Sequence, residues 1–348
     1  MKKKVNFGES IRNSLHNNLS LDKNIFILGL GADYPNGADG THKGLSFEFP
    51  ERVLDTPTSE AALTGLAVGA AASGLRPIVH HGRVEFALFA ADQIFTQAAK
   101  WNDMFGGDYP CPIYLRICIG RQWGNGPQHT QSLLGLFGNC IGLEVLFPYN
   151  PQTASDYISY QRVCSNPVVF LESRWLYKTQ QSVILNNIEY VDGVDVILDE
   201  GDTACVAIGE GIQEVLRARQ YLKNIDSAHE LSVIAITKIN PFPSVLLSEH
   251  LNKFCKIIIF DTYNSPFGFS HECYHAIKSV NENIEIIIIT SPHLSTPISP
   301  VKAASFYPTF FDILQVYSSI KKIDVNFCEN RTVRELSLPP EFNFDEIY

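Results

Sequence analysis

The sequence predicts an α/β protein with two three-layer α/β domains, each built on a mostly parallel sheet with helices on both faces. The first observation is the length, because 348 residues can form two cores. The second is an alternation of short apolar runs with helical segments. The third is a polar, loosely patterned stretch, beyond which the alternation starts again. We therefore expect a first domain over 1–185, a linker over 186–200, a second domain over 201–325 and a tail over 326–348.

The first domain is expected to open with a helix, a strand and a loop rich in Gly, Asp and Asn. This loop, over 32–44, has the composition of a site loop at the carboxyl end of a buried strand. Apolar runs such as PIYLRICIG and PVVFLE are typical of strands buried on both faces. The expected helices lie over 6–18, 59–73, 86–101 and 151–164, and the expected strands over 24–31, 76–81, 112–120, 143–148 and 167–172.

The second domain is expected to repeat this alternation on a smaller scale. The run ACVAIGEG predicts its first strand and turn, and IEIIIIT predicts its last strand. The other expected elements are helices over 214–222, 244–253 and 271–280 and strands over 231–239 and 256–262. The tail is acidic, and we expect it to lie on the surface.

The composition excludes some classes of function. Lys and Arg total 27 against 37 Asp and Glu, and the resulting net charge of −10 argues against a nucleic-acid partner. The basic start, MKKK, is not followed by the apolar stretch of a signal peptide, and no apolar run is long enough to span a membrane. The eight cysteines form no CxxC pair, which is typical of reduced thiols. We expect a cytoplasmic protein.

Glu60 is the first candidate for chemistry. The hydroxyl of Ser59 is expected to cap the helix that follows, which places Glu60 in its first turn. Gly65, Gly69 and Ser73 recur every four residues, so that another backbone could lie close to that face. Because the opposite face is also apolar, we expect the helix to be buried and Glu60 with it. The alternative interpretation is a carboxylate that only complements the helix dipole.

A zinc-binding pattern occurs in the second domain. His271 and His275 enclose Glu272 in the order HExxH, and two histidines four apart on a helix can share a zinc ion with the glutamate as base. However, the pattern starts a short helix and no third ligand is evident. We expect surface or packing roles for these residues.

Several motifs taken together resemble one family. They are DTPTSEAALTGLAVGAA, GLRPIV, FALFAADQI, GPQHTQS, GLEVLFPYNP, NPVVFLE and the closing TPISP and FYPT. Through them the chain resembles, from about residue 6 to 314, the β subunits of the thiamine-diphosphate-dependent 2-oxo acid dehydrogenases, such as pyruvate dehydrogenase. The resemblance implies a transketolase-like pyrimidine-binding domain followed by a transketolase C-terminal-like domain.

The resemblance implies roles for three residues. Glu60 matches the catalytic glutamate that hydrogen-bonds N1′ of the aminopyrimidine ring of thiamine diphosphate and favours its imino tautomer. Phe86 matches the aromatic residue that packs on this ring. His129 matches the histidine that faces the substrate and assists proton transfer, although a lone loop histidine is more often a surface residue.

Half of the site is expected on another chain. The magnesium-binding motif of the family, GDG followed by an asparagine, belongs to the α subunit, and residues 201–211 resemble it only superficially. The resemblance therefore implies an α2β2 assembly that is active only with its α subunit, with magnesium held by that partner. A lipoyl-bearing acyltransferase is a further implied partner. We expect no association with a membrane.

The chain departs from the family at positions that affect the expected substrate. Leu30 stands where the dehydrogenases have an acidic residue, and Gly82 where they have a glutamine. Transfer to an acceptor other than a lipoyl arm, as in a transketolase-like or carboligating enzyme, is therefore an alternative. A non-catalytic regulatory subunit is a second alternative, against which Glu60, Phe86 and His129 together argue.

Two more residues are candidates for the substrate side, and five for a cation. His81 ends a strand beside the expected pocket, with a hydrogen-bonded structural role as the alternative. Arg121 precedes His129 and could meet a carboxylate or phosphate, while a solvated loop arginine is the simpler interpretation. The family also holds a potassium ion through backbone carbonyls, and Cys164 replaces the aspartate that is usual there. The matching positions are Ile113, Gln161, Arg162, Cys164 and Asn166.

Overall fold

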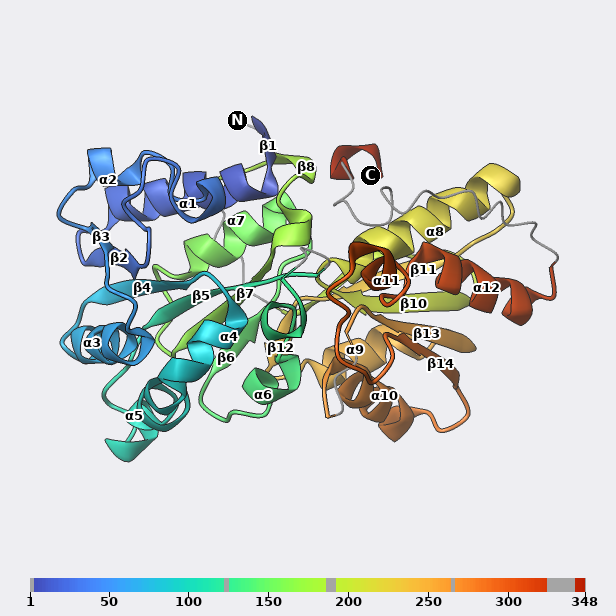
Figure 1. Cartoon of the computed structure of the whole chain (residues 1–348). Coiled ribbons are helices and arrows are strands. Elements are labelled where there is room, and N and C mark those ends of the chain that lie inside the picture. Colours follow the sequence, from blue (N-terminus) through green and yellow to red (C-terminus); the bar gives the residue numbers. More distant parts are fainter. Residues whose placement is uncertain (1–2, 122–124, 186–191, 264–266, 324–341, 348) are drawn as a thin grey trace.

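Two α/β units lie side by side in the computed structural model, the first in blue to green and the second in yellow to red (Figure 1). The structure describes residues 3–121, 125–185, 192–263, 267–323 and 342–347. This arrangement confirms the predicted fold class of two three-layer α/β domains with mostly parallel sheets. No helix in these described ranges is both long and apolar enough to cross a bilayer.

The first unit is built on a seven-stranded sheet in the order β12-β6-β7-β5-β4-β2-β3. All neighbours are parallel except β12, which pairs antiparallel with β6. The strands are β2 (Ile25–Gly29), β3 (Val53–Asp55), β4 (Arg76–His81), β5 (Tyr114–Ile119), β6 (Glu144–Leu146), β7 (Val168–Ser173) and β12 (Lys238–Asn240). Every residue of β5 and β7 is buried, as expected for strands covered on both faces.

Helices cover both faces of this sheet (Figure 1). On one face lie α1 (Phe7–Leu21) and α7 (Pro151–Tyr160). Phe7, Ile11 and Leu15 recur every four residues and are fully buried, so α1 presents one apolar stripe to the sheet. On the other face lie α3 (Glu60–Ala72), a π-helix (Asp92–Ala98) and α5 (Ala99–Met104). The shorter pieces are α2 (Leu45–Glu48), α4 (Val84–Ala87), α6 (Leu134–Gly138), η1 (Ala38–Gly40), η2 (Leu88–Ala90), η4 (Pro127–His129) and η5 (Arg174–Leu176).

The second unit is a five-stranded sheet in the order β14-β13-β10-β11-β9, parallel except for β9. Its strands are β9 (Val194–Leu198), β10 (Thr203–Ile208), β11 (Ser232–Ile236), β13 (Lys256–Asp261) and β14 (Glu285–Thr290). Its helices are α8 (Gly211–Ile225), α9 (Ser244–Leu251), α10 (Phe269–Val280), α11 (Pro300–Ala304) and α12 (Phe310–Lys321). The helices α8 and α12 cover one face, and α9 and α10 the other (Figure 1).

The two units contribute to one hydrophobic cluster, which contains Phe147 of the first and Ile208 and Ile259 of the second. Gly209 has φ +52°, and a Cβ there would lie 2.3 Å from the ring of Phe147, so only glycine permits this approach. β12 also crosses between the units, because its residues belong to the predicted second domain but join the first sheet. The proposed domain boundaries remain a prediction.

Three local expectations differ from the structure. The expected linker includes β9, which pairs with β11. The helix expected over 86–101 is divided into α4, η2, the π-helix and α5. The end of the tail, expected on the surface, packs inward: Phe344, in η6 (Phe344–Glu346), is fully buried against Tyr149, with ring centroids 5.9 Å apart. A small antiparallel pair of β1 (Lys3–Asn6) and β8 (Gln180–Val183) lies beside this end, where Ser182 N donates to Asp345 Oδ1.

Candidate active site

The three principal candidates follow three strands of the first sheet. Glu60 opens α3 after β3, Phe86 lies in α4 after β4, and His129 ends η4 after β5. In the sheet order β5-β4-β2-β3, all these strands are parallel and their carboxyl ends share one edge. That edge is where α/β proteins bind ligands, because the loops there are set by rigid strands.

The carboxylate of Glu60 is available to a ligand. Glu60 is half-buried, and no hydrogen bond or ion pair within the described ranges engages it. Ser59 occupies the N-cap position as predicted, but its hydroxyl makes no capping bond, so that part of the prediction was wrong. The first turn of α3 is therefore held by the backbone alone, with Leu63 N donating to Ser59 O at 3.0 Å.

The prediction that α3 is buried all round was wrong for the single chain. Its sheet-facing stripe, with Leu63, Ala67 and Ala71, is buried, whereas the small-residue side is exposed. Gly69 has no neighbour within 4 Å of an added Cβ, and Leu66 is 60% exposed. Of the three small residues on this side, Gly65 is partly covered, since an added Cβ would lie 3.3 Å from Gln93 Cγ, whereas Gly69 and Ser73 are exposed.

Phe86 and His129 meet directly. Their ring centroids lie 5.6 Å apart with an interplanar angle of 77°, an edge-to-face contact. The turn that carries His129 starts at Gly126, which has φ +70° and accepts from His129 N at 3.2 Å and from Thr130 Oγ1 at 2.9 Å. A Cβ at Gly126 would lie 2.9 Å from Ile298 Cγ1, so the second unit packs tightly on this turn.

Arg121 does not match the simpler interpretation. It is 4% exposed, so it is not a solvated loop arginine. Its guanidinium lies 4.2 Å from the ring centroid of Trp175, and its Nη2 is 3.3 Å from Glu214 Oε1, so its charge is already paired. Glu214 belongs to α8. Arg121 therefore ties the start of the His129 loop to the second unit.

His81 has the surroundings of a hydrogen-bonded structural histidine, which was the alternative to a role on the substrate side. It is 2% exposed, and its Nε2 lies 3.2 Å from Thr64 Oγ1 of α3. Burial lowers the pKa of His81 to about 4, so its ring is neutral at physiological pH. Thr64 lies one turn after Glu60, so this contact fixes α3 against the end of β4.

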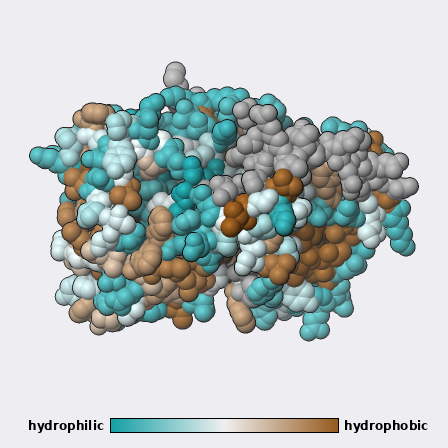
Figure 2. Space-filling view, viewed as in Figure 1, coloured by the Kyte–Doolittle hydropathy of each residue, from teal (hydrophilic) through white to brown (hydrophobic). Residues whose placement is uncertain are grey.

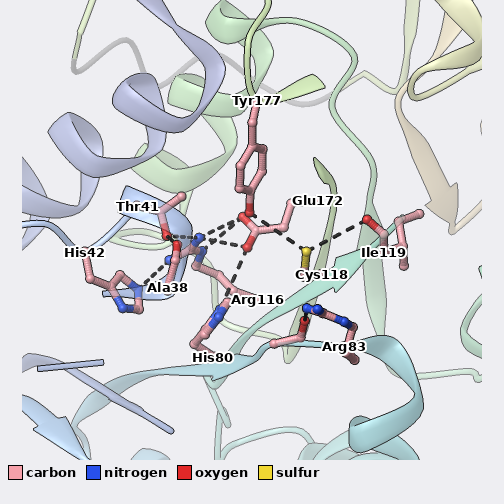
Figure 3. A network of polar contacts seen from close by, with 11 residues as sticks. Ala38, Thr41, His42, His80, Arg83, Arg116, Cys118, Ile119, Glu172 and Tyr177 are labelled. Carbon is pink, nitrogen blue, oxygen red and sulfur yellow. Dashed lines mark hydrogen bonds and ion pairs between the residues drawn. The ribbon is translucent and has the colours of Figure 1, made fainter. Parts of the chain in front are cut away.

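A buried polar network lies between these strands, as Figure 3 shows. Arg116 Nη2 donates to both oxygens of Glu172 at 2.8 Å, and both residues are fully buried. The same guanidinium contacts His42 Nε2 at 2.6 Å and donates to Thr41 Oγ1 at 3.0 Å. The network thereby fastens the loop after β2 to β5 and β7.

The two histidines of the network are neutral. Burial, and then the charge of Arg116, hold the pKa of His42 well below its usual value, and the same two causes act on His80. The network was not predicted, although Arg116 and Glu172 each interrupt an apolar strand. A charged residue inside a buried parallel strand implies a partner on a neighbouring strand, and that signal could have found the pair.

The candidate potassium positions do not fit a cation in this structure. Arg76 Nη2 donates to Gln161 O at 2.6 Å and to Cys164 O at 2.7 Å, so a guanidinium already occupies two of the carbonyls. A third, Ile113 O, accepts from Val168 N. Burial raises the pKa of the Cys164 thiol to about 12, so it adds no negative charge. We derive no role for potassium, and Arg162 and Asn166 keep no assigned function.

The zinc pattern stays on the surface. His271, Glu272 and His275 are all exposed on α10. Within the described parts of the chain, no group of three His, Cys, Asp or Glu side chains could hold a metal ion. The free cysteines there are Cys111, Cys118, Cys140, Cys164, Cys205, Cys255 and Cys273.

A cavity of about 610 Å³ lies between the segment after His129 and the second unit. Neither Lys, Arg, Asp nor Glu is among its lining residues, which include Thr130, Tyr263, His293 and Tyr307. This lining suits an uncharged polar molecule.

The fold is of the transketolase type. Residues 3–180 match the family described as "Transketolase, pyrimidine binding domain". A solved structure, "Split gene transketolase, inactive beta4 tetramer", shares the fold with a TM-score of 0.72 and 16% identity, over 91% of this chain and 98% of that one.

Curated relatives define the group more closely. The pyruvate dehydrogenase E1 component subunit beta of Rickettsia bellii is 31% identical over 97% of this chain and 96% of its own. The acetoin:2,6-dichlorophenolindophenol oxidoreductase subunit beta of Bacillus subtilis is 29% identical over 91% of this chain and 97% of its own. The chain belongs to the family of β subunits of thiamine-diphosphate-dependent 2-oxo acid dehydrogenases.

Proposed function

We propose that this chain is the β subunit of a thiamine-diphosphate-dependent 2-oxo acid decarboxylating dehydrogenase, active only with an α subunit. The observation that carries the proposal is the carboxyl edge of the first sheet. There the half-buried Glu60 has no hydrogen bond or ion pair with the described residues, and at the same edge of the sheet Phe86 and His129 are in contact.

Each residue has a defined task in the proposal. When bound, thiamine diphosphate would supply a carbon nucleophile for the 2-oxo carbon and a cationic ring that accepts the electron pair left when carbon dioxide departs. Glu60 donates to or shares a proton with N1′ of the pyrimidine ring and so selects its imino tautomer. Phe86 orients the ring by packing. His129 takes and returns a proton at the substrate oxygen.

The α subunit is proposed from the exposed surfaces and from the relatives. Figure 2 shows hydrophobic surface over the α4–α6 side of the first unit, where Phe89 is 71% exposed and Leu136 is 44% exposed. With the bare face of α3, this gives a second chain apolar surface to cover. An α2β2 assembly, magnesium held by the α subunit and a lipoyl-bearing acyltransferase as acyl acceptor belong to the same proposal.

The test is decarboxylation of 2-oxo acids by this chain mixed with its α partner. Glu60→Gln is expected to lower kcat by about 10²–10⁴-fold with assembly intact. Glu51→Gln, at an exposed position outside the site, is the matched control and should keep full activity. An unchanged rate in Glu60→Gln would end the catalytic assignment and support a regulatory subunit.

A second candidate function is transfer to, or cleavage of, an uncharged carbonyl compound without a lipoyl arm. The cavity beside the His129 segment favours it, because no Lys, Arg, Asp or Glu lines this cavity, and so does the relative that is named for acetoin. Assays that pair pyruvate or acetoin with either lipoamide or an artificial electron acceptor separate the two functions. Turnover of acetoin with the artificial acceptor alone would favour the second.

A further inference from the structure

Glu85 belongs to α4, the helix that carries Phe86, and its side chain reaches the segment that carries His129. Its Oε1 accepts from Gln131 N at 2.9 Å, two residues after His129. The next residue, Phe86, meets the ring of His129 edge to face. A single turn of α4 therefore contacts the His129 segment twice.

The surroundings of the Glu85 carboxylate disfavour its charged form. Its second oxygen, Oε2, is out of solvent and has no hydrogen-bond partner among the residues described. Burial raises the pKa of Glu85, while the bond from Gln131 N and the charges of His129 and Arg83 act in the opposite direction. A surface glutamate would avoid this desolvation, and such positions are often retained for function.

We propose that Glu85 is a positioning residue for His129, which it holds through Gln131 and whose protonated ring it stabilises with its negative charge. The proposal rests on the proposed function, because the proton transfer by His129 belongs to it. When the ring of His129 takes a proton from the substrate, the imidazolium lies near an ionised carboxylate in a partly dry site, where opposite charges attract more strongly than in water. In this step the proton goes to the ring of His129, and Glu85 acts only through its charge.

The competing explanation is that Glu85 only forms a structural hydrogen bond with Gln131. Variants that change the charge of residue 85 distinguish the two explanations. In Glu85→Gln the amide oxygen can still accept from Gln131 N, but the negative charge is gone. Glu85→Asp keeps the charge on a shorter side chain. The other charge that acts on Glu85, Arg83, is unchanged in both; its Nη1 donates to Gly82 O at 2.6 Å.

The kinetic test uses the full chain with its α partner. Glu85→Gln is expected to lower kcat about tenfold with KM nearly unchanged, because the lost interaction forms only after proton transfer. Glu85→Asp should restore part of the rate. Glu249→Gln, an exposed residue of α9, is the charge-matched control and should behave as the parent. A parental kcat in Glu85→Gln would overturn the proposal.

The second test needs no activity, so it separates this proposal from the proposed function. The His129 ring is titrated by NMR in the β chain alone, with its signal assigned by loss in His129→Gln. Removing a nearby negative charge makes an imidazolium lose its proton more readily, so the midpoint in Glu85→Gln should move to lower pH by roughly half a unit to one unit. An unmoved midpoint refutes the role of Glu85 even if Glu60→Gln is inactive, and a moved midpoint supports it whatever the substrate is.

Discussion

Glu172→Gln tests the buried network beneath the site. The substitution keeps the shape of the side chain but removes the negative charge that faces Arg116, and both residues are fully buried. Glu172 accepts three contacts from this guanidinium, at 2.8, 2.8 and 3.3 Å. In the variant an amide oxygen can keep one of them, and Arg116 is left with a charge that water cannot reach.

The size of the loss follows from that burial. Removing one partner of a buried ion pair destabilises a protein by about 3–5 kcal/mol, because the remaining charge is uncompensated. His42 and Thr41 remain as neutral contacts of the guanidinium and do not replace the charge. We therefore expect the free energy of unfolding to fall by about 3 kcal/mol or more.

The assay is urea unfolding followed by circular dichroism, with Arg116→Met and the double variant completing a mutant cycle. The double variant should lose less than Glu172→Gln alone, because it buries no unpaired charge. A loss below about 1 kcal/mol in Glu172→Gln would show that water or another group compensates Arg116, and would refute the reasoning.

Three further predictions concern the surroundings of the site. Arg121→Ala removes the contacts with Trp175 and Glu214, so limited proteolysis should cut the segment before His129 faster than in the parent. Equal rates would show that Arg121 does not hold this segment against the second unit. The pKa of His81 is lowered from 6.5 to about 4, so the unfolded chain binds a proton that the folded chain rejects as pH falls through this window. Acid unfolding should therefore include a loss of about 3 kcal/mol between pH 6.5 and 4 that is absent in His81→Gln, and identical pH profiles would contradict it. Leu66→Asp, on the exposed face of α3, should block assembly with the α subunit without changing the melting temperature of the free chain; normal assembly would exclude that face as the contact.

Local patterns predicted much of the architecture, because the sequences of buried parallel strands are mostly apolar. PIYLRICIG and NPVVFLE correspond to β5 and β7, which are buried throughout. The break of the helix over 86–101 was not predicted, since FALFAADQI contains no glycine or proline to signal it. The burial of Phe344 depends on a tertiary contact with Tyr149, far away in the sequence.

The site was predicted residue by residue only where a motif carried it. Phe86 and His129 are brought together as the motifs imply, but the pairing of Arg116 with Glu172 joins two strands 56 positions apart. The exposure of α3 had a different reason. A helix that is apolar on all sides is predicted to be buried, but its sequence does not say whether residues of the same chain or of another chain cover it.

The most direct measurement is the exchange of the C2 proton of thiamine diphosphate with deuterium in the assembled enzyme. If Glu60 selects the imino tautomer, exchange in Glu60→Gln should be slower by about 10²–10⁴-fold than in the parent, with the cofactor still bound. Equal exchange rates in the two proteins, at equal occupancy of the cofactor, would contradict the role of Glu60.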